Sequence, residues 1–227
     1  MPLHTADALV LRTYTLGEAD RIVVFLTRDR GKKRGVAKGA RRQRSRFAGA
    51  LEPLTEVRIA YFESERRELV GLNYAETVRS PLSLTASSHS TAAGLAGQYL
   101  LVEYVAELLD EWAQDSDADD RLYRLGASML DAVTGGVPAE PLARYFEYWL
   151  LRLQGVYPEA RGTLSPGALE FLAAARTVSP RDVATMAADA RVLRELEGVH
   201  RTLIATHLEK SLKSDRVMRG MKPDSGK

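Results

Sequence analysis

The first 80 residues contain five short runs of aliphatic, β-branched and aromatic residues, and turn-forming residues separate them. Gly and Asp dominate the turn segments at 17–20 and 29–32, and the runs occupy residues 8–14, 21–27, 34–37, 56–62 and 68–74. Such runs are typical of β-strands joined by tight turns. Five short strands are expected to close into a barrel, because closure leaves no exposed strand edge. We predict a five-stranded OB-fold barrel over residues 1–80; an SH3-like barrel or half-open sandwich fits the same pattern.

After Pro81 the apolar residues recur every three to four positions, which is the period of an α-helix. Between residues 95 and 113 they cover most of a helix circumference, which predicts a helix at the centre of a bundle. Its narrow polar face is expected to meet solvent and consists of Glu103, Glu107, Asp110 and Glu111.

Further helices are predicted from the same periodicity and from their capping residues. Ser-Pro pairs open two of them, at residues 165 and 179, and the others span residues 119–133, 140–154 and 189–212. The fold class is therefore β followed by α. An all-α domain is predicted over 81–213, a boundary near 79–88, and a polar, flexible tail over 214–227.

The composition of the 227 residues excludes several classes of protein. There is no cysteine, so disulfides, thiolate nucleophiles and cysteine-ligated zinc are excluded. No apolar run approaches the roughly 20 residues of a membrane span, and the N-terminus lacks the pattern of a secretory signal. We expect a cytoplasmic protein without membrane contact.

Charge is distributed unevenly along the chain. Residues 1–50 carry twelve Lys and Arg against four Asp and Glu, a net charge of +8, whereas residues 81–200 carry nine against seventeen, a net charge of −8. A basic N-terminal region followed by an acidic region is expected when one end of a protein binds a polyanion.

The basic residues are densest between positions 28 and 46. This segment has one acid, Asp29, and ten cations: Arg28, Arg30, Lys32, Lys33, Arg34, Lys38, Arg41, Arg42, Arg44 and Arg46. Such density predicts contacts with several phosphates, although a solvated basic loop is the alternative. Phe47 follows directly; we expect it in the core, with base stacking as the second possibility.

Signals for catalysis or metal binding are weak. His4, His89, His200 and His207 are scattered, and we expect structural roles for them. The acids between 115 and 120 lack the Gly and final Glu of a calcium loop, so an N-capping turn explains them better. Trp112 and Trp149 lie on apolar stripes and are expected in the core. We predict no catalytic residue and no metal or other cofactor.

Several segments together resemble the RecO family of recombination mediators. The similarity is collinear over most of the chain, and the segments that carry it are residues 17–23, 25–32, 36–42, 45–47, 51–54, 145–158, 164–169 and 201–214. Many relatives carry a four-cysteine zinc module after the helix that ends here at Gly155–Pro158. Here Ser165 and Pro166 follow within a few residues, which indicates a deletion of the module, and zinc is not expected.

The resemblance implies an N-terminal OB-fold, a helical domain and no catalytic site. It implies binding of single- and double-stranded DNA, strand annealing, and loading of RecA onto DNA coated with single-strand-binding protein (SSB), together with RecR and sometimes RecF. It also implies association with the nucleoid. The residues carried over as DNA contacts are Arg30, Lys32, Lys33, Arg34, Lys38, Arg41, Arg42, Arg44 and Arg46.

The family also binds the acidic, Phe-ended tail of SSB through its helical domain. A pocket for that tail needs an apolar floor and a cationic rim. The candidates for the rim are Arg121, Arg124, Arg144 and Arg152.

Two other functions fit the same basic segment. One is an RNA-binding or translation-associated OB-fold protein, because backbone charge alone does not distinguish polynucleotides. The other is a nuclease or nucleotidyl transferase, which would need clustered carboxylates near the basic segment, where only Asp29 lies.

Overall fold

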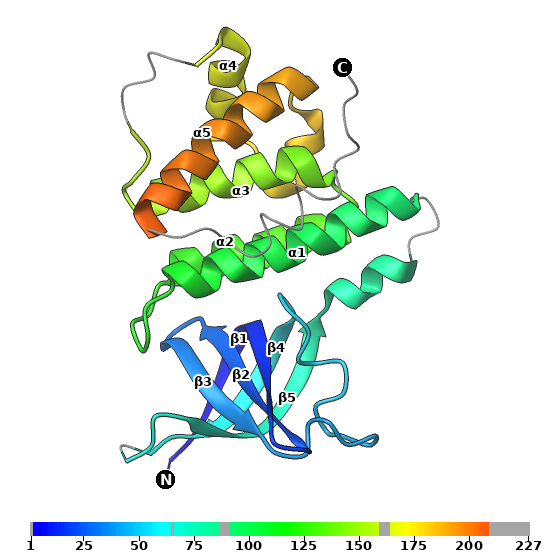
Figure 1. Ribbon diagram of the computed structural model, residues 1–227, viewed down its shortest axis with the longest axis vertical. Helices are drawn as coiled ribbons and strands as arrows, with labels where there is room; N and C mark the ends of the chain where they lie inside the picture. The colour runs from blue at the N-terminus through cyan, green and yellow to red at the C-terminus, as the bar shows by residue number, and fades with distance from the viewer. Residues whose placement is uncertain (1, 65, 87–90, 159–163, 209–227) are drawn as a thin grey trace.

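The N-terminal part of the protein is a closed five-stranded barrel in the computed structural model, which describes residues 2–64, 66–86, 91–158 and 164–208 (Figure 1). The strand order is β1-β2-β3-β5-β4, with β3 and β5 parallel and the other neighbours antiparallel. This is the arrangement of an OB-fold, so the predicted fold class is confirmed. The strands are β1 (Leu3–Leu16), β2 (Asp20–Thr27), β3 (Gly31–Ala37), β4 (Glu56–Phe62) and β5 (Val70–Arg79).

The barrel interior is filled by alternate residues of each strand, because successive side chains of a strand point to opposite faces. Val10, Phe25 and Ile59 belong to this interior cluster. Phe47, from the segment after β3, joins them and is only 2% exposed, which confirms its predicted place in the core.

Five α-helices follow the barrel among the described residues. They are α1 (Ala92–Trp112), α2 (Asp120–Thr134), α3 (Ala139–Leu153), α4 (Pro166–Ala174) and α5 (Ala190–Leu208), with 3₁₀ turns η1 (Pro81–Ala86) and η2 (Pro180–Thr185). Each predicted helix is present within a few residues of its expected start. Asp119 accepts hydrogen bonds from the backbone N–H groups of Arg121 and Leu122, so the expected N-capping turn is confirmed. The predicted end of the last helix at residue 212, the linker at 159–163 and the tail at 214–227 lie outside the described residues.

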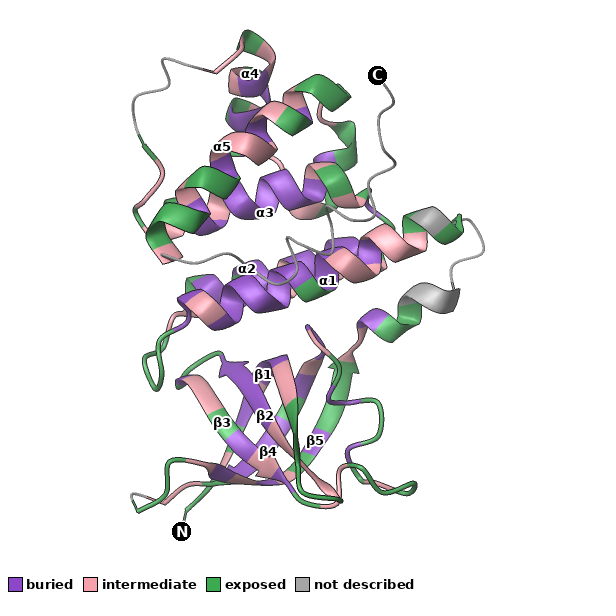
Figure 2. Cartoon of the chain, viewed as in Figure 1, coloured by how far each residue is buried: buried purple, intermediate pink, exposed green. Residues whose placement is uncertain are grey.

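Helices α1 and α2 cover one side of the barrel and share an apolar core with it (Figure 1). Leu9 and Leu11 of β1 and Val24 and Leu26 of β2 belong to this cluster. Figure 2 shows buried residues along most of α1, α2 and α3, which agrees with the predicted central position of α1. The barrel and the first helices therefore pack against each other through a shared apolar core.

Part of the predicted polar face of α1 lies inside this junction. Glu107 and Asp110 are each only 9% exposed. The Arg12 guanidinium lies 3.9 Å from a Glu107 carboxylate oxygen and 3.3 Å from one of Asp110, and Lys32 Nζ lies 3.5 Å from the other Asp110 oxygen. The prediction of a solvated face is wrong for these two acids, because cations of the barrel are their neighbours.

A second polar cluster joins β4 and β5 to α2. Arg79 forms ion pairs with Glu56 at 2.7 Å and with Asp131 at 2.6 Å, and the Tyr123 hydroxyl donates to Glu56 at 3.0 Å. The pKa of Asp131 lies below its usual range, chiefly because Arg181 donates a hydrogen bond to its carboxylate. The junction between the barrel and the helices thus has an apolar centre, and ion pairs lie at its edges.

Two glycines allow the close approach of the barrel and the helices. A Cβ at Gly126 of α2 would lie 2.7 Å from side-chain carbons of Leu9 and Leu109. Gly31, at the start of β3, has φ +68°, and a Cβ there would lie 2.3 Å from the backbone oxygen of Asp117. Beside it, β3 extends its pairing into the loop after α1, because the Lys32 carbonyl accepts from the Ser116 backbone N–H at 3.0 Å.

Substitution of Gly31 should therefore destabilise the fold far more than substitution of another left-handed glycine. We expect Gly31→Ala to lower the free energy of unfolding by more than about 3 kcal/mol, since it adds a backbone overlap to the strain of the positive φ. Gly17→Ala is the matched control, with φ +57° and no atom within 4 Å of the added Cβ. It should cost only about 1 kcal/mol. Equal losses in urea unfolding of both variants would contradict the packing of Gly31 against residue 117.

Candidate nucleic-acid interface

The basic segment continues from β3 into a loop that is attached to the barrel at both ends. We name residues 38–46 the basic loop. At its start the Gly39 backbone N–H donates to the Asp20 carboxylate at 2.7 Å, and the Arg41 backbone N–H donates to the Ala19 carbonyl at 2.9 Å. At its end Phe47 is buried in the barrel. The loop therefore lies beside the β1–β2 turn, at the end of the barrel away from the helices (Figure 1).

The cations of the basic loop and of the exposed part of β3 point into solvent. The exposed residues are Arg34, Lys38, Arg41, Arg42, Arg44 and Arg46. Within the described parts of the chain none of these six forms an ion pair with Asp or Glu. Arg41 donates to the Gly17 carbonyl at 3.0 Å, and the Arg46 guanidinium lies 5.1 Å from the centre of the Phe47 ring. Each of the six charges thus remains available to a phosphate.

Two of the predicted cations, Lys32 and Lys33, are already neutralised by carboxylates of the fold. Lys32 is half-buried, and its Nζ donates to the Asp110 carbonyl at 2.6 Å in addition to its carboxylate contact. Lys33 donates to the Glu63 carboxylate at 2.7 Å, and this hydrogen bond lowers the pKa of Glu63. Arg30 lies 3.6 Å from the carboxylate of its neighbour Asp29. The structure therefore assigns Lys32 and Lys33 to the fold rather than to a free cationic surface.

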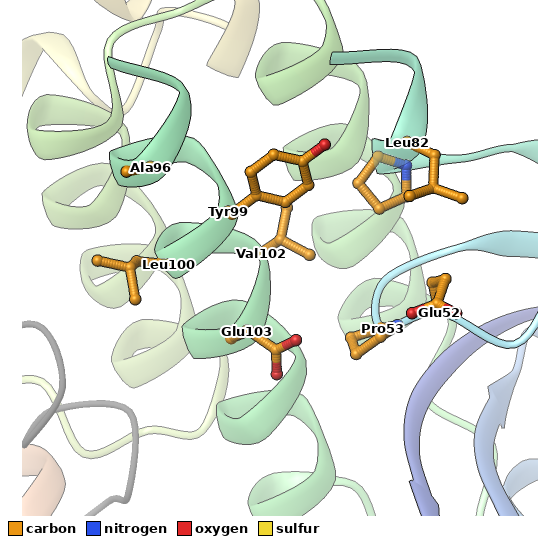
Figure 3. A pocket seen from close by; sticks show the side chains of 9 residues that line it. Glu52, Pro53, Leu82, Ala96, Tyr99, Leu100, Val102 and Glu103 are labelled. Atoms are coloured by element: carbon orange, nitrogen blue, oxygen red, sulfur yellow. The ribbon is translucent and has the colours of Figure 1, made fainter. Parts of the chain in front are cut away.

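A groove of about 310 Å³ opens between the barrel and α1. Figure 3 shows Tyr99 and Glu103 of α1 facing Leu82 and Pro53 across it. Glu52 also lines this groove, and burial together with the charge of Glu52 raises the pKa of Glu103. Its walls are apolar and its charged groups are carboxylates, so it does not suit a polyanion or an acidic peptide.

The structure removes Arg144 from the predicted cationic rim. It is only 3% exposed, and its guanidinium lies 2.8 Å from the Glu147 carboxylate inside the helical bundle. The Tyr104 hydroxyl and the His200 ring contact the same carboxylate at 2.8 and 3.0 Å. This network connects α1, α3 and α5, and sequence periodicity did not reveal that Arg144 faces inward.

The other three candidates are exposed, but in two different settings. Arg121 and Arg124 face the acids at the start of α2, with Arg124 at 2.8 Å from Asp120. Arg152 lies 5.8 Å from the centre of the Trp149 ring and donates to the Tyr148 hydroxyl at 2.9 Å.

Arg176, which sequence reasoning missed, also donates to the Tyr148 hydroxyl at 2.9 Å. Arg152 and Arg176 therefore meet at the buried Tyr148 hydroxyl, with the half-buried Trp149 ring beside Arg152. Their separation in the sequence hides this proximity, since α3 and the end of α4 meet only in the fold.

The predicted core positions of the two tryptophans hold to different degrees. Trp112 is buried and its ring stacks on His207 with centroids 5.3 Å apart, whereas Trp149 is half-buried and donates to the Ala175 carbonyl.

Over the described ranges, no cluster of three or more His, Asp or Glu is placed to hold a metal ion. Over the same ranges, no helix has the length and apolar character needed to cross a bilayer.

Two family models match this chain. Residues 1–81 match "Recombination protein O N terminal", and residues 97–162 match "Recombination protein O C terminal". The first match covers the barrel and the basic loop, and the second covers the helices from α1 to α3.

Several curated proteins named DNA repair protein RecO are similar to this chain. The protein of Koribacter versatilis is 39% identical over 157 residues, which cover 69% of this chain and 61% of the relative. That of Anaeromyxobacter sp. (strain K) is 37% identical over 150 residues, covering 66% and 56%. The protein of Bifidobacterium adolescentis is 53% identical over 78 residues, or 34% and 31%. The chain thus spans about three fifths of the length of the first two relatives.

The division of the cations into paired and free groups leads to opposite expectations for two lysines. We expect Lys32→Ala to lower the free energy of unfolding by about 2 kcal/mol, because it leaves the buried Asp110 with one cation fewer. Lys38→Ala should change it by less than about 0.5 kcal/mol. Urea unfolding of the two variants measures both values, and a larger loss for Lys38→Ala would contradict the assignment.

Proposed function

This chain belongs to the RecO family, and we propose that it is a non-catalytic DNA-binding mediator of recombinational repair whose basic loop contacts the DNA backbone. The observation that carries the proposal is the group of six exposed cations without a carboxylate partner among the described residues, on the basic loop and β3. Cations on an ordered loop approach phosphates without first giving up an ion pair, so binding releases counterions from the DNA at little cost to the protein.

Phosphate contacts of this kind suit both single- and double-stranded DNA, because both present the same backbone. They also suit annealing, since neutralised phosphates let two complementary strands approach. The DNA repair proteins among the relatives support DNA rather than RNA as the ligand. The chain offers no cysteine for the zinc module of its relatives, so the proposed function does not depend on that metal.

We extend the proposal to the protein partners that the family resemblance implies. These are RecR, in some species RecF, and SSB, whose displacement allows RecA to load onto the DNA. For the acidic tail of SSB we propose the surface around Arg152, one of the predicted residues, together with Arg176 and the half-buried Trp149. There the Arg152 guanidinium lies beside the Trp149 ring, and the buried Tyr148 hydroxyl accepts from both arginines. Two guanidinium groups next to one aromatic ring match a carboxylate followed by an apolar side chain.

The proposed role of the basic loop in DNA binding is tested by changing Lys38, Arg41, Arg42 and Arg44 together to Ala. We expect affinity for a labelled single-stranded oligonucleotide to fall more than about tenfold at low salt. The slope of log affinity against log salt should flatten by about 0.7 for each phosphate that the variant can no longer bind.

A control variant with the same change in net charge carries Arg121, Arg124, Arg194 and Arg201 changed to Ala on the helical domain. It should keep the affinity and the salt slope of the wild type. Equal losses in both variants would mean that binding follows overall charge and not the basic loop.

The proposed SSB-tail surface is tested with a short labelled peptide that is acidic and ends in Phe. We expect Arg152→Ala to weaken its binding about tenfold, because a charge-assisted hydrogen bond to a carboxylate is removed. Arg121→Ala serves as the control and should bind like the wild type. Unchanged binding by Arg152→Ala in fluorescence anisotropy would reject this position for the tail.

A further inference from the structure

The outer surface of β1, β2 and β3 carries a row of apolar side chains beyond the edge of the helices. Tyr14 pairs with Ile22 across β1 and β2, and Ile22 pairs with Val36 across β2 and β3. The neighbouring residues Val23 and Ala37 belong to the barrel interior. Since side chains alternate along a strand and paired residues share a face, these three residues point outward. We name them the Tyr14 row.

This row is open to solvent, unlike the part of the same surface nearer the helices. Tyr14 is 47% exposed, and Ile22 and Val36 are half-buried. Leu9 and Leu26, on the same outer surface but closer to the helices, are buried beneath them. The Tyr14 row is thus the part of this apolar outer surface that the helices leave uncovered.

Cations lie on both sides of the Tyr14 row. The next row toward the helices contains Arg12, Val24 and Arg34, and Arg34 is exposed and free of described ion pairs. On the other side lie Leu16, Asp20 and Lys38. The Asp20 carboxylate accepts from the Gly39 backbone N–H at the start of the basic loop. Adjacent rows are two residues apart, or about 7 Å. One exposed cation thus lies on each side of the apolar row, Arg34 toward the helices and Lys38 toward the basic loop.

The Tyr14 ring is held in place from one side. Arg12 Nη1 donates to the Tyr14 hydroxyl at 3.3 Å, and Arg12 is itself bound to Glu107 and Asp110 of α1. The Tyr14 side chain is therefore already restricted by its hydrogen bond to Arg12. A ligand that covers the ring then costs less conformational entropy than it would on a freely rotating side chain.

We propose that the Tyr14 row is a stacking platform for the unpaired bases of single-stranded DNA, with a base lying on the Tyr14 ring. The proposal rests on the function proposed above and adds a preference that phosphate contacts cannot supply. Bases of a single strand can turn their faces to an aromatic ring while the phosphates meet Arg34 and Lys38. The bases of a duplex are stacked on one another, so a duplex can use only the cations.

The test compares Tyr14→Ala with the wild type on a labelled oligothymidylate and on a duplex of equal length. We expect a loss of about fivefold or more on the single strand, the lower end of what one stacked base contributes. Duplex affinity should stay within about twofold, and the salt slope should not change because no charge is removed. Tyr14→Trp should retain the single-strand affinity, since stacking needs an aromatic face but not the hydroxyl group.

Tyr74→Ala is the matched control, because Tyr74 is 38% exposed and pairs with Ala60 on the β4–β5 side of the barrel. It should bind both ligands like the wild type. Wild-type single-strand affinity for Tyr14→Ala would overturn the platform, and so would equal losses on the single strand and the duplex. If Tyr14→Ala is unchanged while the basic-loop variant is weak, only the platform fails. If the basic-loop variant binds like the wild type, the proposed function fails instead.

Discussion

The barrel and the helices share one apolar core, and the ion pairs of Arg12 and Lys32 with Glu107 and Asp110 mark the edge of that core. Four charged groups at a half-buried boundary are stable only as long as each keeps its partner, because an unpaired charge there would lose its hydration without compensation. The contact therefore specifies one orientation of the barrel beneath α1. That orientation decides which part of the outer surface of β1 to β3 is covered by helices and which part is open to a ligand.

The same junction divides a uniformly basic segment into two functional parts. At the start of β3, Lys32 and Lys33 meet carboxylates of α1 and of the end of β4 and become part of the fold. At the other end of the strand, Lys38 and the arginines of the basic loop lie beyond the reach of the acidic helices. The charge asymmetry of the chain thus has two consequences: it attaches the barrel to its own helices, and the remaining cations form the surface that we assign to DNA.

The helical domain uses its charged residues mainly to organise itself. Arg144, Glu147 and His200 form a buried network that ties α3 to α5, with Tyr104 adding α1. Buried networks of this kind specify packing most strongly when every polar atom is paired. In this one Arg144 Nε and Nη1 have no hydrogen-bond partner among the described residues. Exposed arginines without a described ion pair also lie on α5, at Arg191, Arg194 and Arg201. The pair Arg152 and Arg176 is distinguished from them by the Trp149 ring beside Arg152.

The number and order of the strands and helices, the β-then-α fold class and the basic segment were predictable from the sequence, because they depend on local periodicity, turn residues and charge density. Phe47 and the cap at Asp119 were predictable for the same reason. The strand ends were not, since β1 (Leu3–Leu16) and β5 (Val70–Arg79) extend beyond their apolar runs. Which charges are free followed from tertiary contacts: Lys32 pairs with Asp110 of α1, whereas Lys38 is exposed and forms no ion pair with the described residues. The tertiary structure also decided that Tyr14 lies in an open row, because β-strand register and the edge of the helical cover arise from contacts between distant segments.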